Sequence, residues 1–352
     1  MNHGEEGDTN PGGAWTTRYQ YRRYRWPEHE EGAGRLTPEG YRIIESQVTE
    51  TRDSHYTIVM KRRQFITRAG STAFGIATVG ATANTVTANR TVSLVSTREH
   101  FTDEGDLAAG RTATGYDTNG NVPGIDAACA DDLTVFVHGW NKNGDDPEAE
   151  ALAKFHEADT ALGEAGYTGT LVGYTWDSDK GGGVDFGWGE AQAVAQSNGP
   201  KLANFVLDYA RNCSGTLRFI SHSLGAQVVF SALRTLDADS TWNANGYRLA
   251  SVHLLGAAQD NEAPTTEWRD TYEALVYETE LTFNYYSQED DVLAWVYNTI
   301  EFDQALGESG AESGNTTPGN YSDYDATSQV GSNHSSYVSS LADEVVSDMA
   351  LS

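Results

Sequence analysis

Short apolar runs alternate with longer segments of helical periodicity along most of the chain after residue 90. The runs of strand type cover 91–96, 133–137, 170–176, 217–220, 249–255 and 281–287. Apolar positions at helical spacing, or segments rich in helix-forming residues, cover 147–166, 190–210, 224–236, 268–277, 292–306 and 337–351, and 307–333 is expected to be a polar loop. The alternation predicts an α/β fold, with a mostly parallel central sheet and helices on both faces.

Ser223 stands between the apolar run 217–220 and the helical segment that starts at residue 224, within the sequence SHSLG. A serine at the tip of a sharp strand-to-helix turn is held clear of its own backbone, beside free backbone N–H groups. The same residue could also be an ordinary helix cap. The pentapeptide resembles the G-x-S-x-G elbow of the α/β-hydrolases, with Ser221 in place of the first glycine.

This resemblance implies that residues 89–352 form an α/β-hydrolase domain with Ser223 as the nucleophile. It also implies an oxyanion hole, a pair of N–H groups that binds the negative oxygen of the reaction intermediate. Leu224 would provide the first N–H. The strand 133–137 ends in His138-Gly139-Trp140, which resembles the HG turn of lipases and esterases, so Trp140 or Gly139 would provide the second.

The family order of serine, acid and histidine leaves two histidines after the serine. His253 lies within an apolar run and is expected to be a core residue, whereas His334 lies in a polar loop and is the expected base. The orienting acid of the family usually follows the strand expected at 281–287, where Asp290 fits best. Asp291 and Asp260 are the alternatives.

The expected reaction is hydrolysis of a small-molecule carboxylic ester or lipid by a Ser-His-Asp mechanism, with no cofactor. Trp176, Phe186 and Trp188 are candidates to line a substrate pocket, and the short segment after 249–255 predicts a small cap or none. No Cys/His cluster has metal-ligand spacing. The alternative is an exported binding protein that keeps the fold without activity.

Cys129 and Cys213 each lie four residues before an apolar run, at Leu133 and Leu217. The two corresponding strands are adjacent and parallel in α/β-hydrolases. The resemblance therefore implies that both cysteines lie at the edge of the sheet away from the active site, within reach of a disulfide.

Residues 60–88 resemble a twin-arginine signal peptide. They contain Arg62, Arg63 and Phe65, a mildly apolar stretch and small-residue cleavage sites. Met60 is then the expected start of translation, and 1–59 an upstream extension without a domain of its own. The mature protein would be exported to the cell surface or beyond, without an integral membrane segment.

Acidic residues dominate the rest of the chain. Residues 91–352 contain 11 Lys and Arg against 41 Asp and Glu, a net charge of about −30. Such a surface repels nucleic acid and anionic lipid, so neither is an expected partner. Dispersed carboxylates with few lysines resemble the proteins of extreme halophiles.

The thermal stability of the protein should therefore depend steeply on salt. Repulsion among the carboxylates destabilises the compact state, and the repulsion is screened within about 3 Å at 1 M salt. We expect the melting temperature, followed by circular dichroism, to climb between about 0.1 M and about 3 M KCl. A constant melting temperature over this range would contradict the halophilic interpretation.

Overall fold

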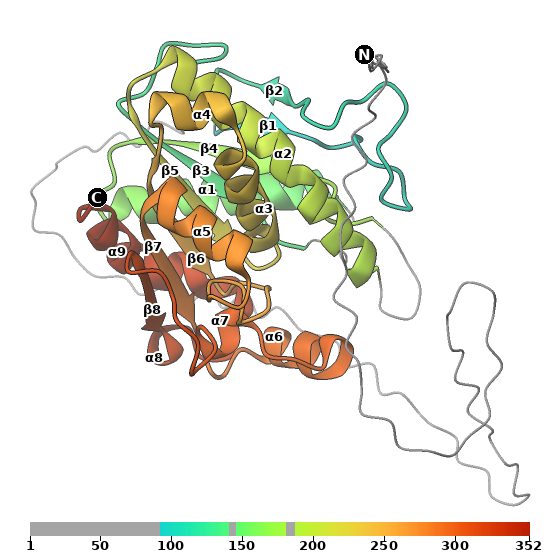
Figure 1. Cartoon of the computed structure of the whole chain (residues 1–352), viewed down its shortest axis with the longest axis vertical. Coiled ribbons are helices and arrows are strands. Elements are labelled where there is room, and N and C mark those ends of the chain that lie inside the picture. The colour runs from blue at the N-terminus through green and yellow to red at the C-terminus, as the bar shows by residue number, and fades with distance from the viewer. Residues whose placement is uncertain (1–91, 141–145, 181–186) are drawn as a thin grey trace, which may run out of the picture. The chain divides into compact units, whose positions relative to one another are not determined.

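The computed structural model describes residues 92–140, 146–180 and 187–352 (Figure 1). The predicted signal peptide at 60–88 and the preceding residues 1–59 lie outside the described residues. No helix in the described part of the chain is long and apolar enough to cross a lipid bilayer.

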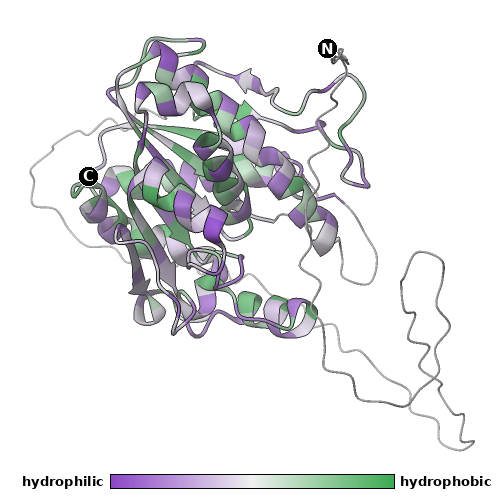
Figure 2. Cartoon of the chain, viewed as in Figure 1, coloured by the Kyte–Doolittle hydropathy of each residue, from purple (hydrophilic) through white to green (hydrophobic). Residues whose placement is uncertain are grey.

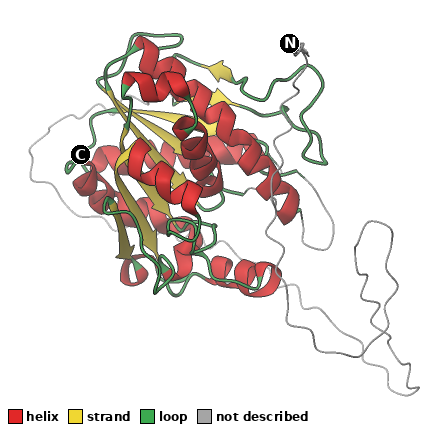
Figure 3. Ribbon diagram, in the orientation of Figure 1, coloured by secondary structure: helices red, strands yellow, loops and turns green. Residues whose placement is uncertain are grey.

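An eight-stranded sheet forms the centre of the described fold (Figure 3). Its strands are β1 (Ser93–Ser96), β2 (Asp117–Asn119), β3 (Asp132–Val137), β4 (Thr170–Thr175), β5 (Thr216–His222), β6 (Leu249–Leu255), β7 (Thr279–Tyr286) and β8 (Tyr321–Asp325). Their order across the sheet is β2-β1-β4-β3-β5-β6-β7-β8, and every neighbouring pair is parallel except β1 with β2. The predicted α/β class with a mostly parallel sheet is confirmed.

Helices cover both faces of this sheet. They are α1 (Pro147–Glu164), α2 (Trp188–Asn212), α3 (Gly225–Asp237), α4 (Ser240–Asn245), α5 (Arg269–Glu278), α6 (Asp291–Val296), α7 (Leu306–Ser309), α8 (Thr327–Val330) and α9 (Tyr337–Met349). One apolar core lies between the sheet and α2, α3 and α5, and the second lies between the sheet and the pair α1 and α9. Figure 2 shows the apolar residues concentrated in the central strands, which agrees with their burial.

Two expectations for the last third of the chain were wrong. The helix expected over 292–306 continues from α6 into a π-helical turn, Tyr297–Glu301, and ends where Phe302 adopts a positive φ of 57°. Beyond it the backbone turns back to pair with the segment after β6, and Leu306 N–H donates to the carbonyl of Gln259 at 2.7 Å. The helix therefore ends earlier than its apolar spacing predicts, because the residues that follow pair with another segment of the chain.

The loop expected over 307–333 contains α7, β8 and α8. β8 has the sequence YSDYD, and the side chains of Ser322 and Asp323 are exposed. It lies at the edge of the sheet and is defined by its parallel pairing with β7. An edge strand needs few apolar residues, and so its sequence resembled a polar loop.

Cys129 and Cys213 are joined by a disulfide, with their Cα atoms 5.6 Å apart. The register of β3 and β5 explains the proximity, because Leu133 is paired with Leu217. Both cysteines precede these strands by the same number of residues. They therefore meet at the edge of the sheet where the parallel strands begin.

Candidate active site

Ser223 occupies a strained turn between β5 and α3. Its φ is +55°, a left-handed conformation that is uncommon for residues other than glycine and costs on the order of 1–3 kcal/mol. The turn is tied to the end of β6: Ser223 N–H donates to Leu255 O at 3.0 Å, and Ser223 O accepts from Ala258 N–H at 3.1 Å. The structure thus holds the serine at the carboxyl edge of the sheet, where the sharp turn was expected.

Two glycines allow this turn to pack against the His138-Gly139-Trp140 turn after β3. A Cβ atom on Gly139 would lie 2.7 Å from Ser223 Cβ, and a Cβ on Gly225 would lie 2.5 Å from the carbonyl oxygen of Val137. Neither position has room for a side chain. The two turns that the sequence singled out are therefore in direct contact.

The buried side chain of His138 stabilises the His138-Gly139-Trp140 turn. Its Nε2 accepts a hydrogen bond from Trp176 N–H at 3.2 Å, so the ring proton is on Nδ1, which donates to Gly139 O at 2.7 Å. Burial, assisted by the charge of Arg98, lowers the pKa of His138 to about 3 and keeps the ring neutral. Because a trans peptide has its N–H opposite its C=O, the N–H of Trp140 points away from His138.

Trp176 is not available to line a substrate pocket, which corrects the expectation for this residue. Its side chain is fully buried, stacks on His138 with ring centroids 5.7 Å apart, and donates from Nε1 to His138 O at 2.9 Å. It supports the turn through His138.

His334 and Asp290 form a short hydrogen bond between the loops after β8 and β7. The distance from His334 Nδ1 to Asp290 Oδ2 is 2.7 Å. Asp290 is fully buried, and its Oδ1 accepts from the N–H groups of Val292 and Leu293 at the start of α6. Tyr337 OH donates to the same Oδ2 at 3.2 Å. The carboxylate thus fixes both the histidine ring and the first turn of a helix.

The charge state of Asp290 follows from these contacts. Burial alone would raise the pKa of Asp290, but the hydrogen bond and charge of His334 outweigh it and hold the pKa below its usual range. The ionised Asp290 accepts a hydrogen bond from His334 Nδ1–H. In the tautomer with its proton on Nδ1, His334 Nε2 carries no proton, and this buried atom has no hydrogen-bond partner in the described part of the chain.

His222 is a site residue that the sequence reasoning missed. Its Nε2 donates to the backbone carbonyl of His334 at 2.8 Å, and the two rings lie 4.8 Å apart. Burial and the neighbouring His334 lower the pKa of His222 to about 3, so the His222 ring is neutral at neutral pH. The contact holds the His334 loop beside the residue that precedes Ser223. The sequence signal for His222 is its position within SHSLG, directly before Ser223.

The two alternative acids lie elsewhere. Asp291 is exposed at the start of α6. Asp260 lies after β6, in an isolated backbone bridge with Ala305. His253 is a core residue as expected, with its ring nitrogens 3.1 Å from Tyr285 OH and 2.9 Å from Ser251 Oγ.

The remaining candidates lie around this site. Leu224 directly precedes α3, whose start is capped by none of the described side chains. Ser221 is fully buried opposite Val137 in β3, and its hydroxyl has no partner among the described residues. Trp188 is buried at the start of α2, edge-on to Trp140 at 5.3 Å. Phe186 lies outside the described residues.

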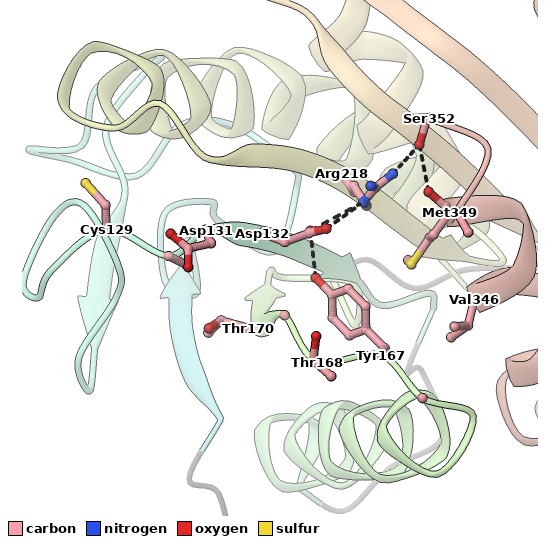
Figure 4. A pocket seen from close by; sticks show the side chains of 14 residues that line it. Cys129, Asp131, Asp132, Tyr167, Thr168, Thr170, Arg218, Val346, Met349 and Ser352 are labelled. Atoms are coloured by element: carbon pink, nitrogen blue, oxygen red, sulfur yellow. Dashed lines mark hydrogen bonds and ion pairs between the residues drawn. The ribbon is translucent and has the colours of Figure 1, made fainter.

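A cavity of about 570 Å³ opens at the opposite edge of the sheet (Figure 4). It is lined by the amino-terminal ends of β3, β4 and β5 and by the end of α9. Arg218 points toward Asp132 and Ser352 there, and Tyr167 OH donates to Asp132. Arg218, Asp132 and Tyr167 are thus paired with one another, and the cavity is separate from Ser223.

Within the described ranges, no group of three or more His, Cys, Asp or Glu side chains is arranged to hold a metal ion.

Residues 179–349 match the model of a family described as "Protein of unknown function (DUF726)". The matched region contains Ser223, Asp290 and His334, whereas the His138-Gly139-Trp140 turn precedes it. A search of curated proteins gives no match. These comparisons leave the function to be argued from the site itself.

Replacement of Asp290 by alanine should destabilise the protein, whether or not the protein is an active enzyme. The change removes a helix cap and leaves His334 Nδ1–H without its acceptor, which together cost about 2–4 kcal/mol, whereas Tyr337 OH keeps Gly307 O as an acceptor. Urea unfolding in molar salt measures this loss. Asp291→Ala is the matched control, since an exposed neighbour should change stability by no more than about 0.5 kcal/mol. Equal effects of the two substitutions would contradict the described contacts.

Proposed function

We propose that the protein is a serine hydrolase of the α/β-hydrolase type that cleaves carboxylic esters. Ser223 is the nucleophile, His334 the base and Asp290 the residue that orients the base. The proposal is supported by the strained serine turn, by its contact with the Gly139 turn, and by the resemblance of both turns to those of esterases and lipases.

One observation carries the proposal. His334 is fixed through Nδ1 by a buried, ionised carboxylate, and its other ring nitrogen is buried beside the serine turn with no partner among the described residues. Buried polar atoms usually have partners, so an unpartnered ring nitrogen needs an explanation. A neutral histidine held in this tautomer is a general base, and such a base is what a serine nucleophile requires.

In the first half of the reaction, His334 Nε2 takes the proton from Ser223 as Oγ attacks the ester carbonyl. The new C–O bond places a negative charge on the former carbonyl oxygen, which the N–H groups of Leu224 and Trp140 stabilise. Gly139 is the alternative donor. The intermediate collapses when the bond to the alcohol breaks and the alcohol takes the proton from His334.

In the second half, His334 takes a proton from water, and the resulting hydroxide attacks the acyl carbon. Collapse of the second intermediate breaks the bond to Ser223 Oγ, which recovers its proton from His334. The products are the free acid and the alcohol, and the enzyme is unchanged. No step requires a cofactor.

We also propose that the protein acts outside the cytoplasm. The disulfide between Cys129 and Cys213 favours an oxidising compartment, because disulfides are rare in reducing cytoplasm. The twin-arginine pattern at 60–88 agrees with export.

A panel of acyl esters of graded chain length, assayed in molar salt, tests the proposed function. We expect hydrolysis of at least one ester and its loss in Ser223→Ala. Asp290→Asn should lower kcat by a factor on the order of 10⁴, because the amide favours the wrong tautomer of the base.

Asp291→Asn and Asp260→Asn are the controls and should retain most of the activity. Absence of hydrolysis across the whole panel would favour a binding protein that keeps the fold. Hydrolysis that persists in Ser223→Ala would assign the nucleophile elsewhere.

A further inference from the structure

His222 joins the candidate base to the strand that carries the candidate nucleophile. It is the last residue of β5 and directly precedes Ser223. Its Nε2 lies 2.8 Å from the backbone carbonyl oxygen of His334. A carbonyl oxygen can only accept a hydrogen bond, so Nε2 carries the proton and the His222 ring donates. At this contact the ring is therefore a donor and not a second base.

The backbone of His222 belongs to a rigid part of the fold. β5 lies between β3 and β6 in the sheet, and His222 is paired with Leu255 of β6. The N–H of the next residue, Ser223, donates to Leu255 O at 3.0 Å. Groups on paired strands are held more precisely than groups on loops. The donor on His222 thus has a fixed position relative to Ser223.

The base, in contrast, lies on the loop 331–336, which connects α8 to α9 and includes a 3₁₀ turn at His334–Ser336. Side chains from other segments donate to the carbonyl oxygens of this loop, and His222 donates to that of the base residue itself. The others act before and after it: Ser287 Oγ donates to Gly331 O at 2.6 Å, and Lys154 Nζ donates to Ser335 O at 3.3 Å.

The rings around this contact pack against one another. The ring centroids of His222 and His334 are 4.8 Å apart, with the planes tilted by 42°. Tyr337 is edge-on to His334 at 6.1 Å and lies 6.3 Å from the ring of His222. Asp290 holds the His334 ring at Nδ1, whereas His222 holds the His334 backbone at its carbonyl. The histidine is therefore constrained from both ends.

We propose that His222 is a positioning residue: its ring N–H fixes the backbone of His334 and thereby keeps the His334 ring in place beside Ser223. Its effect on a reaction rests on the proposed hydrolase function. A general base must stay within hydrogen-bond reach of the proton that it takes. A displacement of about 1 Å costs a rate factor on the order of 100.

His222→Gln and His222→Phe separate the hydrogen bond from the ring packing. The amide nitrogen of Gln is as many bonds from the backbone as Nε2 of His, whereas Phe keeps a ring but has no donor. With an ester that the unaltered protein hydrolyses, kcat should fall about tenfold or more in His222→Phe and less than about threefold in His222→Gln. KM should change by less than about twofold in both, because the base and not the substrate is displaced.

His222→Asn is a second variant without an effective donor, for use where Phe prevents folding. Its amide is one carbon shorter than that of Gln, so kcat should fall as in His222→Phe. Lys154→Met is the matched control on the same loop. It removes a partly exposed donor to Ser335 O and should change kcat by less than about threefold. Urea unfolding in molar salt compares the stability of all variants.

A proton resonance gives a readout that needs no catalysis. The Nδ1 proton of His334 lies in the short hydrogen bond to Asp290 and should give a downfield ¹H signal that is absent in His334→Gln. Exchange of this proton with water should be at least about tenfold faster in His222→Phe and nearly unchanged in His222→Gln. A merely structural role of His222 would lower the stability of both variants without this difference in exchange.

An unchanged kcat in His222→Phe, or a larger loss in His222→Gln than in His222→Phe, would overturn the inference. A loss in Lys154→Met as large as that in His222→Phe would also overturn it, because the effect would then belong to the loop as a whole. Faster proton exchange in His222→Phe without hydrolysis of any ester would support the positioning of His334 and reject the hydrolase. Hydrolysis that depends on Ser223, with exchange and kcat unchanged in His222→Phe, would retain the hydrolase and reject the positioning role.

Discussion

The buried carboxylate of Asp290 is the interaction on which the candidate site depends. It joins three elements that are separate in sequence, because it caps α6, holds His334 from the loop after β8 and accepts from Tyr337 at the start of α9. A buried charge is stable only when hydrogen bonds or an opposite charge satisfy it, and here hydrogen bonds from the backbone, His334 and Tyr337 do so. The same contacts that stabilise the carboxylate therefore determine the tautomer and the position of the histidine.

A second constraint is the close approach of two turns at the carboxyl edge of the sheet. Ser223 adopts its strained conformation because β6 holds its backbone on one side and Gly139 packs against it on the other. His138 and Trp176, both buried and hydrogen-bonded, keep the Gly139 turn in place. Strain at one residue is thus maintained by a rigid surrounding, as is common at functional sites.

Much of the fold and the pairing at the site could be predicted from the sequence. The buried strands were recognisable from their apolar runs, and the offset of Cys129 and Cys213 from β3 and β5 matched the register that joins them. Edge strand β8 was missed because its residues are mostly polar, and the end of the π-helical turn was missed because tertiary pairing determines it. The roles of His222 and Trp176 depend on contacts between distant segments, which local sequence patterns do not encode.

Covalent labelling of the folded protein by a fluorophosphonate tests the central claim most directly, since the probe reacts only with a serine that a neighbouring base activates. We expect mass spectrometry of the digested protein to locate a single adduct on Ser223. The adduct should be lost in His334→Ala and retained in His253→Gln, which changes a histidine of the core. An adduct on another residue, or labelling of Ser223 that is undiminished without His334, would contradict the account.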